Sequence, residues 1–386
     1  MSHQIRDILN GRCLVHVGDC IEVMRSMPAN SVDCVVTSPP YWGLRDYGVE
    51  GQIGLEPTLA EHLQVMVAVF EEVRRILKPT GTCWVNYGDC YATTPNGRSA
   101  ADTKATGNDD RTFRDKPFST IQGVLKAKDL CMVPNRFAIA LQEAGWWVRS
   151  EIIWAKPNPM PESIRDRPAT SHEKIFMLTK SPRYFYDKDA VRQNMAASSV
   201  SRLSQDIENQ TGSTRANGGR KTNGNMKAVG GTGVGWRYQE DGSREKRVKK
   251  RGHEREHEGF RDKWDDMTKA EQQANGRNLR NYEPAPIEAW NIATQPFSDA
   301  HFATFPPELA ERCIMAGCPK GGTVLDPFGG AGTTALVALR HGRSAQLIEL
   351  NPEYADITCR RIEKEWKVQR QPKQVDHGPL FAGSAA

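Results

Sequence analysis

The chain has 386 residues, 38% of them hydrophobic, and a formal net charge of +5. This length allows one large α/β domain with an insertion, or two domains, and no apolar run approaches the roughly 20 residues that a membrane span needs. Because the amino terminus lacks a signal-peptide pattern and the nine cysteines form no C-x-x-C pair, we expect a cytoplasmic protein with free thiols. The mildly basic charge permits nucleic-acid binding but does not by itself indicate it.

Residues 1–90 alternate between strand-like and helix-like segments. Short apolar runs rich in β-branched residues predict buried strands at 13–17, 33–37 and 82–86. Helices are predicted at 20–27 and at 59–77, where apolar residues recur at helical spacing up to a Lys-Pro-Thr-Gly stop signal. This alternation predicts a doubly wound, mainly parallel α/β sheet with helices on both faces.

Two later regions, 121–190 and 284–367, return to this alternation. Predicted strands are 151–155, 174–179, 322–328 and 343–350, and predicted helices are 135–144, 306–316, 333–341 and 351–367. Gly145 follows the first of these helices as its predicted C-terminal cap.

Two other segments have a different texture. Residues 91–120 lack apolar periodicity and predict a long mobile loop. Residues 191–282 are rich in Gly, Asn, Ser, Arg and Lys, which is typical of a flexible insertion. A nucleic-acid-facing element is equally consistent, since basic residues are interleaved with Trp236, Tyr238, Phe260 and Trp264. His253 and His257 have no partner ligands in the sequence, so we expect no metal site.

A glycine-rich turn separates the predicted strand 322–328 from the next helix. The strand contains Asp326, the turn continues through Gly329, Gly330 and Gly332, and the following strand ends in Glu349. Glycines allow close backbone approach, a helix start offers unpaired N–H groups, and an acid at the second strand end can hold both ribose hydroxyls. An acid and a proline at 326–327 suit a cationic ligand better than the pyrophosphate of a dinucleotide. The pattern therefore favours S-adenosylmethionine over NAD.

The predicted strand 33–37 runs directly into Ser38-Pro39-Pro40-Tyr41-Trp42. The prolines lack N–H donors, so local carbonyls can accept hydrogen bonds, and Ser38 adds a hydroxyl oxygen. Tyr41 and Trp42 offer flat faces on which a planar ring can stack. Hydrogen-bond acceptors beside an aromatic ring suit the –NH2 group of a base that has been flipped out of a duplex. The alternative is a proline-rich turn whose aromatic residues pack in the core.

Together these segments resemble the amino-methyltransferases of DNA, which modify N4 of cytosine or N6 of adenine. TSPPYW at 37–42 is similar to their catalytic motif, and DPFGGAGT at 326–333 is similar to their cofactor motif. The catalytic motif comes first in the chain, which resembles the β group of the family. Further similar blocks lie at 18–20, 153–161, 171–176, 301–306 and 348–354.

The resemblance implies a Rossmann-like S-adenosylmethionine-dependent methyltransferase fold. It makes 1–90 the catalytic half of the core, 121–190 its continuation, 191–283 a target-recognition insertion, 284–367 the cofactor-binding half and 368–386 a flexible tail. Predicted catalytic residues are Ser38, Pro39, Pro40 and Tyr41. Predicted cofactor-binding residues are Asp19, Cys20, His301, Thr304, Phe305, Asp326, Phe328, Gly329, Gly330, Gly332, Thr333 and Glu349.

The expected chemistry is direct in-line attack of an amino nitrogen on the methyl group. Ser38 and the Pro39 carbonyl would accept the two amino protons while Tyr41 stacks the base. Carbon-5 methylation is disfavoured because no Pro-Cys stands at the strand end, and Cys34 lies within the strand. In the family Ser-Pro-Pro-Tyr is associated with N4 of cytosine. N6 of adenine is the alternative, and an RNA methyltransferase or an inactive DNA-binding or regulatory protein are alternatives of other classes.

The expected partner is double-stranded DNA, with no membrane partner. Basic residues within 244–255 and 98–116 would contact phosphates, so we expect binding that falls steeply with salt. A solvated charged face is the alternative for these residues. A homodimer and a separate restriction endonuclease are both compatible with the sequence.

Overall fold

The computed structural model describes residues 4–44, 48–94, 118–159, 161–191, 288–295 and 305–370, and the backbone of two short strands at 235–238 and 244–247. The chain divides into two compact units, Met1–Val191 with Ile287–Ala386, and Arg192–Pro286. In its described part the second unit consists of β7 (Gly235–Tyr238) paired antiparallel with β8 (Arg244–Arg247).

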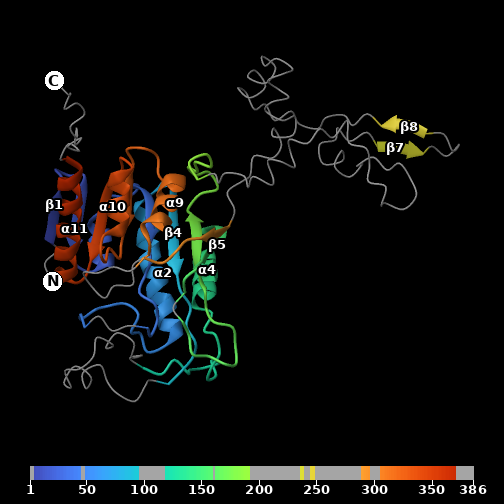
Figure 1. Cartoon of the computed structure of the whole chain (residues 1–386), viewed down its shortest axis with the longest axis horizontal. Helices are drawn as coiled ribbons and strands as arrows, with labels where there is room; N and C mark the ends of the chain where they lie inside the picture. Colours follow the sequence, from blue (N-terminus) through green and yellow to red (C-terminus); the bar gives the residue numbers. More distant parts are fainter. Residues whose placement is uncertain are drawn as a thin grey trace, which may run out of the picture. The chain divides into compact units, whose positions relative to one another are not determined.

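The first unit is built on a nine-stranded sheet (Figure 1). Its strands are β1 (Gln4–Ile8), β2 (Cys13–Val17), β3 (Val32–Thr37), β4 (Leu77–Tyr87), β5 (Trp147–Ala155), β6 (His172–Thr179), β9 (Ala289–Asn291), β10 (Thr323–Asp326) and β11 (Ser344–Glu349). Their order is β1-β2-β11-β10-β3-β4-β6-β5-β9. The run from β2 to β4 is parallel, whereas β1 and β6 are antiparallel to their neighbours. The carboxyl ends of β2, β11, β10 and β3 therefore share one edge.

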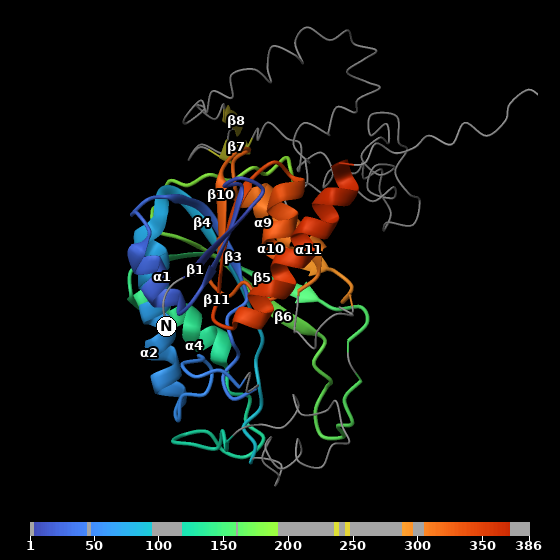
Figure 2. The same ribbon diagram turned by 90° about the vertical axis from the view of Figure 1, so that its left-hand side faces the viewer.

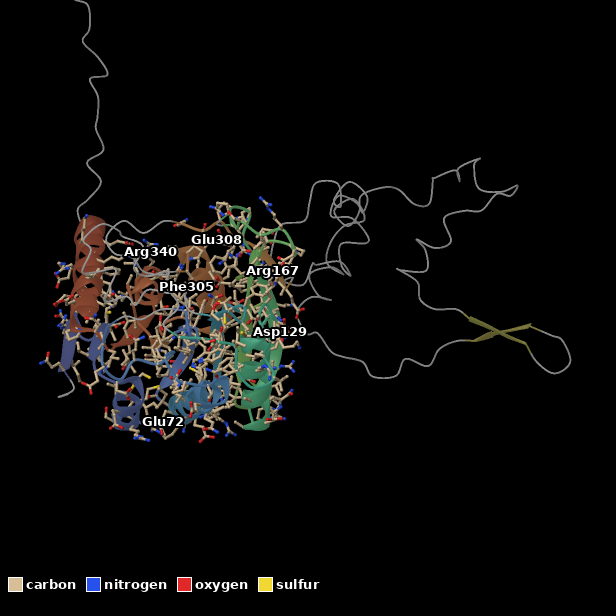
Figure 3. The ribbon with its side chains drawn as sticks, turned by 90° about the horizontal axis from the view of Figure 1, so that it is seen from below. Glu72, Asp129, Arg167, Phe305, Glu308 and Arg340 are labelled. Carbon is tan, nitrogen blue, oxygen red and sulfur yellow. The ribbon has the colours of Figure 1, made fainter. Side chains whose placement is uncertain are left out.

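Helices cover both faces of this sheet (Figure 2). One layer contains α1 (Cys20–Ser26), α2 (Leu59–Ile76) and α4 (Val133–Glu143), and the other contains α9 (Pro307–Gly317), α10 (Thr333–Arg340) and α11 (Pro352–Arg370). The buried apolar residues form two clusters, one on each side of the sheet. Seen from below, Glu72 of α2 marks one outer layer, and Glu308 of α9 and Arg340 of α10 mark the other (Figure 3).

The helix α2 shows why these segments fold as they do. Its buried residues include Met66, Val69, Phe70 and Val73, whose spacing puts them on one helical face. Thr58 caps the first turn, and a reciprocal bond from the Glu61 side chain completes a capping box. In the described part of the chain, no helix is both long and apolar enough to span a bilayer.

The predicted α/β class is confirmed, and most predicted elements differ from the observed ones only at their ends. Gly145 has a φ of 90° after α4, and its N–H bonds to the Gln142 carbonyl, as expected of a cap. The expected stop at Lys78–Gly81 is instead part of β4, which begins directly after α2. This is possible because Leu77 pairs with Val32 before the register shifts. The edge strands β1 and β9 were not predicted, since short edge strands carry little apolar pattern.

Candidate active site

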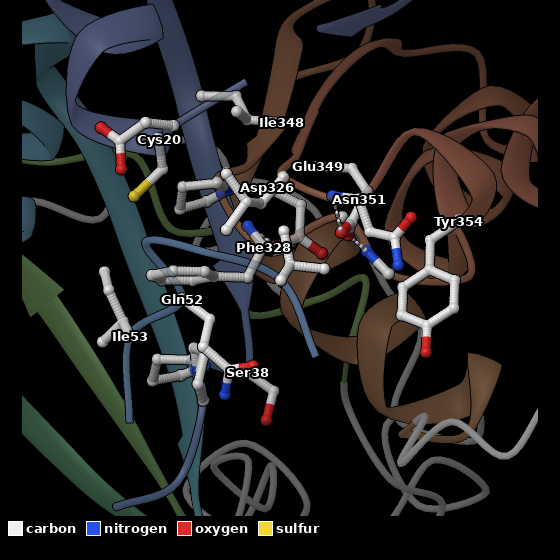
Figure 4. Close-up of a pocket in the computed structure, with 18 of the residues that line it drawn as sticks. Cys20, Ser38, Gln52, Ile53, Asp326, Phe328, Ile348, Glu349, Asn351 and Tyr354 are labelled. Atoms are coloured by element: carbon white, nitrogen blue, oxygen red, sulfur yellow. Dashed lines mark hydrogen bonds between the residues drawn. The ribbon is translucent and has the colours of Figure 1, made fainter. Parts of the chain in front are cut away.

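A pocket opens at the shared carboxyl edge of β2, β3, β10 and β11 (Figure 4). It encloses about 1220 Å³, including the space at its open mouth, which is ample for a nucleoside-sized ligand. Ser38 and Gln52 lie on one side, whereas Glu349, Asn351 and Tyr354 lie on the other. The predicted catalytic loop and the predicted cofactor turn, nearly 300 residues apart in the sequence, thus line one cavity.

The four predicted catalytic residues, Ser38 to Tyr41, all line the pocket. Trp42 does not, because it is buried with 1% exposure and its indole N–H donates to the Glu56 carbonyl oxygen over 3.0 Å. Its ring also lies 5.8 Å from that of Phe118. The prediction that Trp42 offers a stacking face is therefore wrong: it is a core residue whose polar atom finds an internal acceptor.

Tyr41 is held from several sides. Its ring lies against the backbone of Gly88, where a Cβ would come within 2.5 Å of the ring atom Cε2, so only glycine fits there. The ring of Tyr87 is 5.4 Å away and tilted by 42°. Burial, followed by the nearby charge of Glu173, raises the pKa of Tyr41 well above its ordinary value. The phenol is therefore un-ionised at neutral pH, with a fixed ring position.

A hydrogen-bond network fixes the direction of each hydroxyl hydrogen near Ser38. One oxygen of Glu173 is paired with Lys156, and the other lies 2.9 Å from the Tyr41 hydroxyl. The amide of Asn86 donates to this same oxygen over 2.8 Å and to the Tyr41 oxygen over 3.1 Å. A carboxylate only accepts, so Tyr41 gives it its single hydrogen. Ser38, 3.3 Å from the Tyr41 hydroxyl, must then donate to it. The lone pairs of the Ser38 oxygen remain as acceptors.

Asp326 stands at the end of β10 and is 2% exposed. One of its oxygens accepts from the Thr37 hydroxyl over 2.6 Å and from the Phe328 N–H over 3.1 Å. The other oxygen lies 2.8 Å from the Thr334 hydroxyl. Burial raises the pKa of Asp326 to about 7. Although Asp326 lines the pocket, both of its oxygens are engaged inside the protein, where they fix the turn.

Glu349 ends the neighbouring strand β11 and lines the other side of the pocket. Its two oxygens accept from different backbone groups, the Gly330 N–H over 2.8 Å and the Asn351 N–H over 2.9 Å. Burial raises the pKa of Glu349, while these bonds oppose the rise. A carboxylate offers about four acceptor sites, so acceptor capacity remains for a hydroxyl group of a ligand.

The glycine turn is held in place from α11. Gly332 has a φ of 75°, and a Cβ at this position would lie 2.6 Å from Cγ2 of Thr358. The Thr358 hydroxyl donates to the Gly330 carbonyl over 2.6 Å, and Arg361 donates to the Ala331 carbonyl over 2.7 Å. The contribution of Thr358 and Arg361 was missed from the sequence, where they appear as ordinary helix residues.

The predicted residues after β2 lie at the same edge. Asp19 accepts from the Glu22 N–H over 3.0 Å and thereby caps α1, and the Gly18 N–H bonds to the Glu349 carbonyl. Cys20 lines the pocket, and burial raises the pKa of its thiol to about 12, so it is neutral there. Asp19 and Cys20 are therefore placed by helix capping and by strand pairing.

A loop that the sequence did not indicate forms a further wall of the pocket, through residues such as Gln52 and Ile53. Glu56 holds this loop by accepting from the Gly54 N–H, and its carboxylate lies 2.7 Å from Nδ1 of His62. The other nitrogen of the fully buried His62 bonds to the Tyr87 hydroxyl. Only the glycine-rich spacing around this segment could have drawn attention to it.

Of the remaining predicted cofactor residues, Phe305, Phe328, Gly329, Gly330 and Thr333 line the pocket, and Gly332 shapes the turn without lining it. His301 and Thr304 lie outside the described residues, as do Phe260 and Trp264 of the proposed nucleic-acid element. The part of the chain that the structure describes contains no group of three or more residues arranged to hold a metal ion.

The charges of the pocket fit a cationic ligand. The ionisable carboxyl groups among its described lining residues are those of Asp19, Asp326 and Glu349, and none of these lining residues is lysine or arginine. A pyrophosphate would be repelled, whereas S-adenosylmethionine carries a sulfonium and an ammonium group and no phosphate. The hydroxyl-binding capacity of Glu349 and the close approach at the glycine turn fit its ribose and its amino-acid portion.

Comparison with known proteins identifies a DNA methylase family, of N6- and N4-methyltransferases, over residues 32–360. The chain is 40% identical over 357 residues to the type II methyltransferase M.Cfr9I of Citrobacter freundii, with 92% of this chain and 89% of the relative covered. It is 37% identical over 350 residues to M.SmaI of Serratia marcescens, with 91% and 90% covered. The solved PvuII DNA methyltransferase (cytosine-N4-specific) shares the fold, with a TM-score of 0.51 at 17% identity over 92% of this chain and 91% of that one.

These relatives span nearly the whole chain, and the family match includes both the Ser38 loop and the glycine turn. The chain therefore belongs to the N6/N4 family of DNA methylases and uses S-adenosylmethionine as its methyl donor.

Proposed function

We propose that the protein transfers a methyl group to N4 of a specific cytosine in duplex DNA, after that base has been flipped out of the helix. Family membership favours DNA over the RNA substrate and over the inactive regulatory protein that the sequence left as alternatives. The choice of cytosine rests on the Ser-Pro-Pro-Tyr loop, which resembles the N4 members of the family.

The observation that supports an amino group as the acceptor of the methyl group is the direction of the hydrogen bond from Ser38. Because Ser38 gives its hydrogen to Tyr41, its oxygen faces the pocket as an acceptor rather than a donor. The amide of Pro39 has no N–H, and its carbonyl can serve as a second acceptor. Two acceptors match the two hydrogens of an exocyclic –NH2 group and would orient its lone pair towards the methyl donor.

The other pocket residues take roles that follow from their placement. Tyr41 lines the pocket with its ring fixed, so it supplies a rigid face for stacking the flipped base. Glu349 binds the ribose hydroxyls, and the turn from Phe328 to Thr333, with Asp19, Cys20 and Phe305, surrounds the rest of the cofactor. When bound, S-adenosylmethionine supplies an activated methyl group to the oriented nitrogen.

Base flipping requires the protein to hold DNA beside this pocket. We infer that the second unit, with its basic and aromatic composition, reads the target sequence. The relatives are type II methyltransferases by name, and a separate restriction endonuclease with the same target is the partner we propose. A homodimer is compatible with these roles.

Mass spectrometry of nucleosides tests the proposal. Plasmid DNA is incubated with the protein and S-adenosylmethionine, digested to nucleosides and compared with DNA treated with Ser38→Ala protein. N4-methylcytosine in the wild-type sample supports the proposal. N6-methyladenine would assign the same amino chemistry to the other base, and no modified nucleoside from protein that binds the cofactor would contradict duplex plasmid DNA as its substrate.

A further inference from the structure

A continuous chain of hydrogen bonds leads from the catalytic serine out of the pocket. Ser38 donates to Tyr41 over 3.3 Å, and Tyr41 donates to Glu173 over 2.9 Å. The Glu173 side chain is 18% exposed and lies outside the residues that line the pocket. The chain thus connects an oxygen in the pocket with a carboxylate that can exchange protons with solvent.

The proposed reaction has to dispose of one proton. As the amino nitrogen forms its bond to the methyl carbon, the carbon–sulfur bond breaks and the sulfur keeps the electron pair. The nitrogen then carries the positive charge until one of its hydrogens leaves to a base within reach. On the cofactor side, both oxygens of Asp326 accept internal hydrogen bonds, and the remaining acceptor capacity of Glu349 is assigned to the ribose hydroxyls. The Ser38 oxygen is the acceptor that the catalytic loop itself provides.

We propose that Glu173 is the final acceptor of this proton and receives it through Ser38 and Tyr41. The amino hydrogen passes to Oγ of Ser38, the hydroxyl hydrogen of Ser38 passes to Tyr41, and that of Tyr41 passes to Oε2 of Glu173. Ser38 and Tyr41 each end as neutral hydroxyls, and Glu173 ends as a carboxylic acid that releases its proton to water. Glu173 is thus a positioning residue that acts through the two pocket residues, and this inference rests on the proposed function.

The surroundings of Glu173 support this direction of transfer. Asn86 donates to both the Tyr41 oxygen and the Glu173 oxygen, which holds these two oxygens beside each other. Lys156 pairs with the remaining Glu173 oxygen and stacks 4.5 Å over the ring of Trp154, so the cation stays beside the carboxylate. Because the pKa of Tyr41 is raised, the phenol gives up its hydrogen only as it receives another.

A second ion pair close to Glu173 offers a matched control for the Glu173 variants. Next to Glu173 on β6, Lys174 forms an ion pair with Glu151 of β5 and a hydrogen bond with Asn135 of α4. This pair joins β5 and β6, and the Lys156–Glu173 pair joins β6 to the residue that follows β5. Glu151 is not among the residues that line the pocket. Glu151→Gln therefore removes a carboxylate of the same kind without breaking the chain from Ser38.

The test is the single-turnover rate of methyl transfer, with cofactor affinity measured beside it. Glu173→Gln keeps the side-chain shape but cannot accept the proton, so its rate is lower on the order of 10²-fold. Glu173→Asp restores a carboxylate and recovers part of the rate.

Two further variants separate a relay from a purely structural role. Tyr41→Phe interrupts the chain, and the double variant with Glu173→Gln should be no slower than the slower single variant, since both remove one pathway. Glu151→Gln keeps the wild-type rate. Affinity for S-adenosylmethionine is unchanged in Glu173→Gln.

Each outcome has a distinct meaning. A Glu173→Gln protein with the wild-type rate, or a Glu173→Asp protein as slow as Glu173→Gln, overturns the relay while the proposed function stands. If the rate losses of Tyr41→Phe and Glu173→Gln multiply in the double variant, the relay is also overturned. Wild-type protein that binds the cofactor but methylates no amino group overturns the proposed function, and the relay with it.

Discussion

The hydroxyl of Thr37 donates to Asp326 over 2.6 Å and thereby joins the ends of two adjacent parallel strands, β3 and β10. Thr37 immediately precedes the predicted catalytic loop, and Asp326 immediately precedes the predicted cofactor turn. Both residues are buried. The two predicted parts of the active site are therefore tied together where their strands end.

The raised pKa of Asp326 predicts a pH-dependent contribution to stability. Between the ordinary value of 3.8 and about 7, the folded protein keeps this proton while the unfolded chain has lost it. The contribution is fully present below that window and is lost as the pH rises through about 7. Asp326→Asn stays neutral, and its amide can donate to Thr334, whose hydroxyl also lies 3.2 Å from the Val36 carbonyl.

We therefore expect the free energy of unfolding of Asp326→Asn to rise relative to wild type as pH increases across this window, with a limiting slope of about 1.4 kcal/mol per pH unit. Urea unfolding of both proteins at several pH values measures the difference directly. A wild-type-minus-variant difference that does not change with pH would show that Asp326 is ionised in the folded protein throughout.

Gly332→Ala should damage the cofactor turn more than a comparable change elsewhere. Its φ of 75° strains any L-residue, and the added Cβ meets Thr358 at 2.6 Å. Gly342→Ala is the control, since Gly342 has a φ of 70° but no atom within 4 Å of an added Cβ. The control should lose about 1 kcal/mol of stability from backbone strain. Gly332→Ala should lose more stability than this control and should also bind S-adenosylmethionine more weakly. If the two variants lost stability and cofactor affinity equally, the proposed fit of the glycine turn would be contradicted.

Ser38→Ala should slow methyl transfer without weakening cofactor binding. Removing one oriented hydrogen-bonding group in a reaction centre costs on the order of 10²-fold in rate. Single-turnover kinetics and cofactor titration separate the two effects. Ser31→Ala is a suitable control, because Ser31 bonds to the Pro28 carbonyl in a turn away from the pocket. If Ser38→Ala matched the control in rate, Ser38 would have no role in orienting the amino group.

DNA binding should weaken steeply as salt concentration rises. Each phosphate that the protein neutralises adds about −0.9 to the slope of log affinity against log salt. Each lysine that contacts a phosphate contributes about one to the magnitude of this slope. Substitutions that remove the charge of Lys246, Lys249 or Lys250 in the second unit should each lower it by that amount. Fluorescence anisotropy with a labelled duplex at several salt concentrations measures this slope. A flat response would assign these lysines to a solvated surface.

Local patterns in the sequence are sufficient to predict the central strands of the sheet and the two loops that line the pocket. The positions of Asp326 and Glu349 at adjacent strand ends follow from apolar runs that stop at an acidic residue. A parallel sheet then brings such ends to one edge. What the sequence could not give is the set of partners for each polar group, because these partners come from distant segments.

Trp42 and Glu173 show this limit from opposite directions. Trp42 looked exposed beside Tyr41, but the loop ending at Glu56 folds back and supplies an acceptor for its indole. Glu173 lay in a block that resembled the family without an assigned role. Only the antiparallel pairing of β6 with β4 brings it to Tyr41, 132 residues away in sequence.

The most direct measurement is transfer of a deuterium-labelled methyl group from S-adenosylmethionine to duplex DNA, followed by mass spectrometry of the nucleosides. The wild-type protein should yield N4-methylcytosine that carries all three deuterium atoms, and Ser38→Ala protein should yield on the order of 10²-fold less in the same time. Label in a base at any position other than an exocyclic amino group, or equal labelling by both proteins, would contradict the assignment of this pocket and its serine to amino methylation.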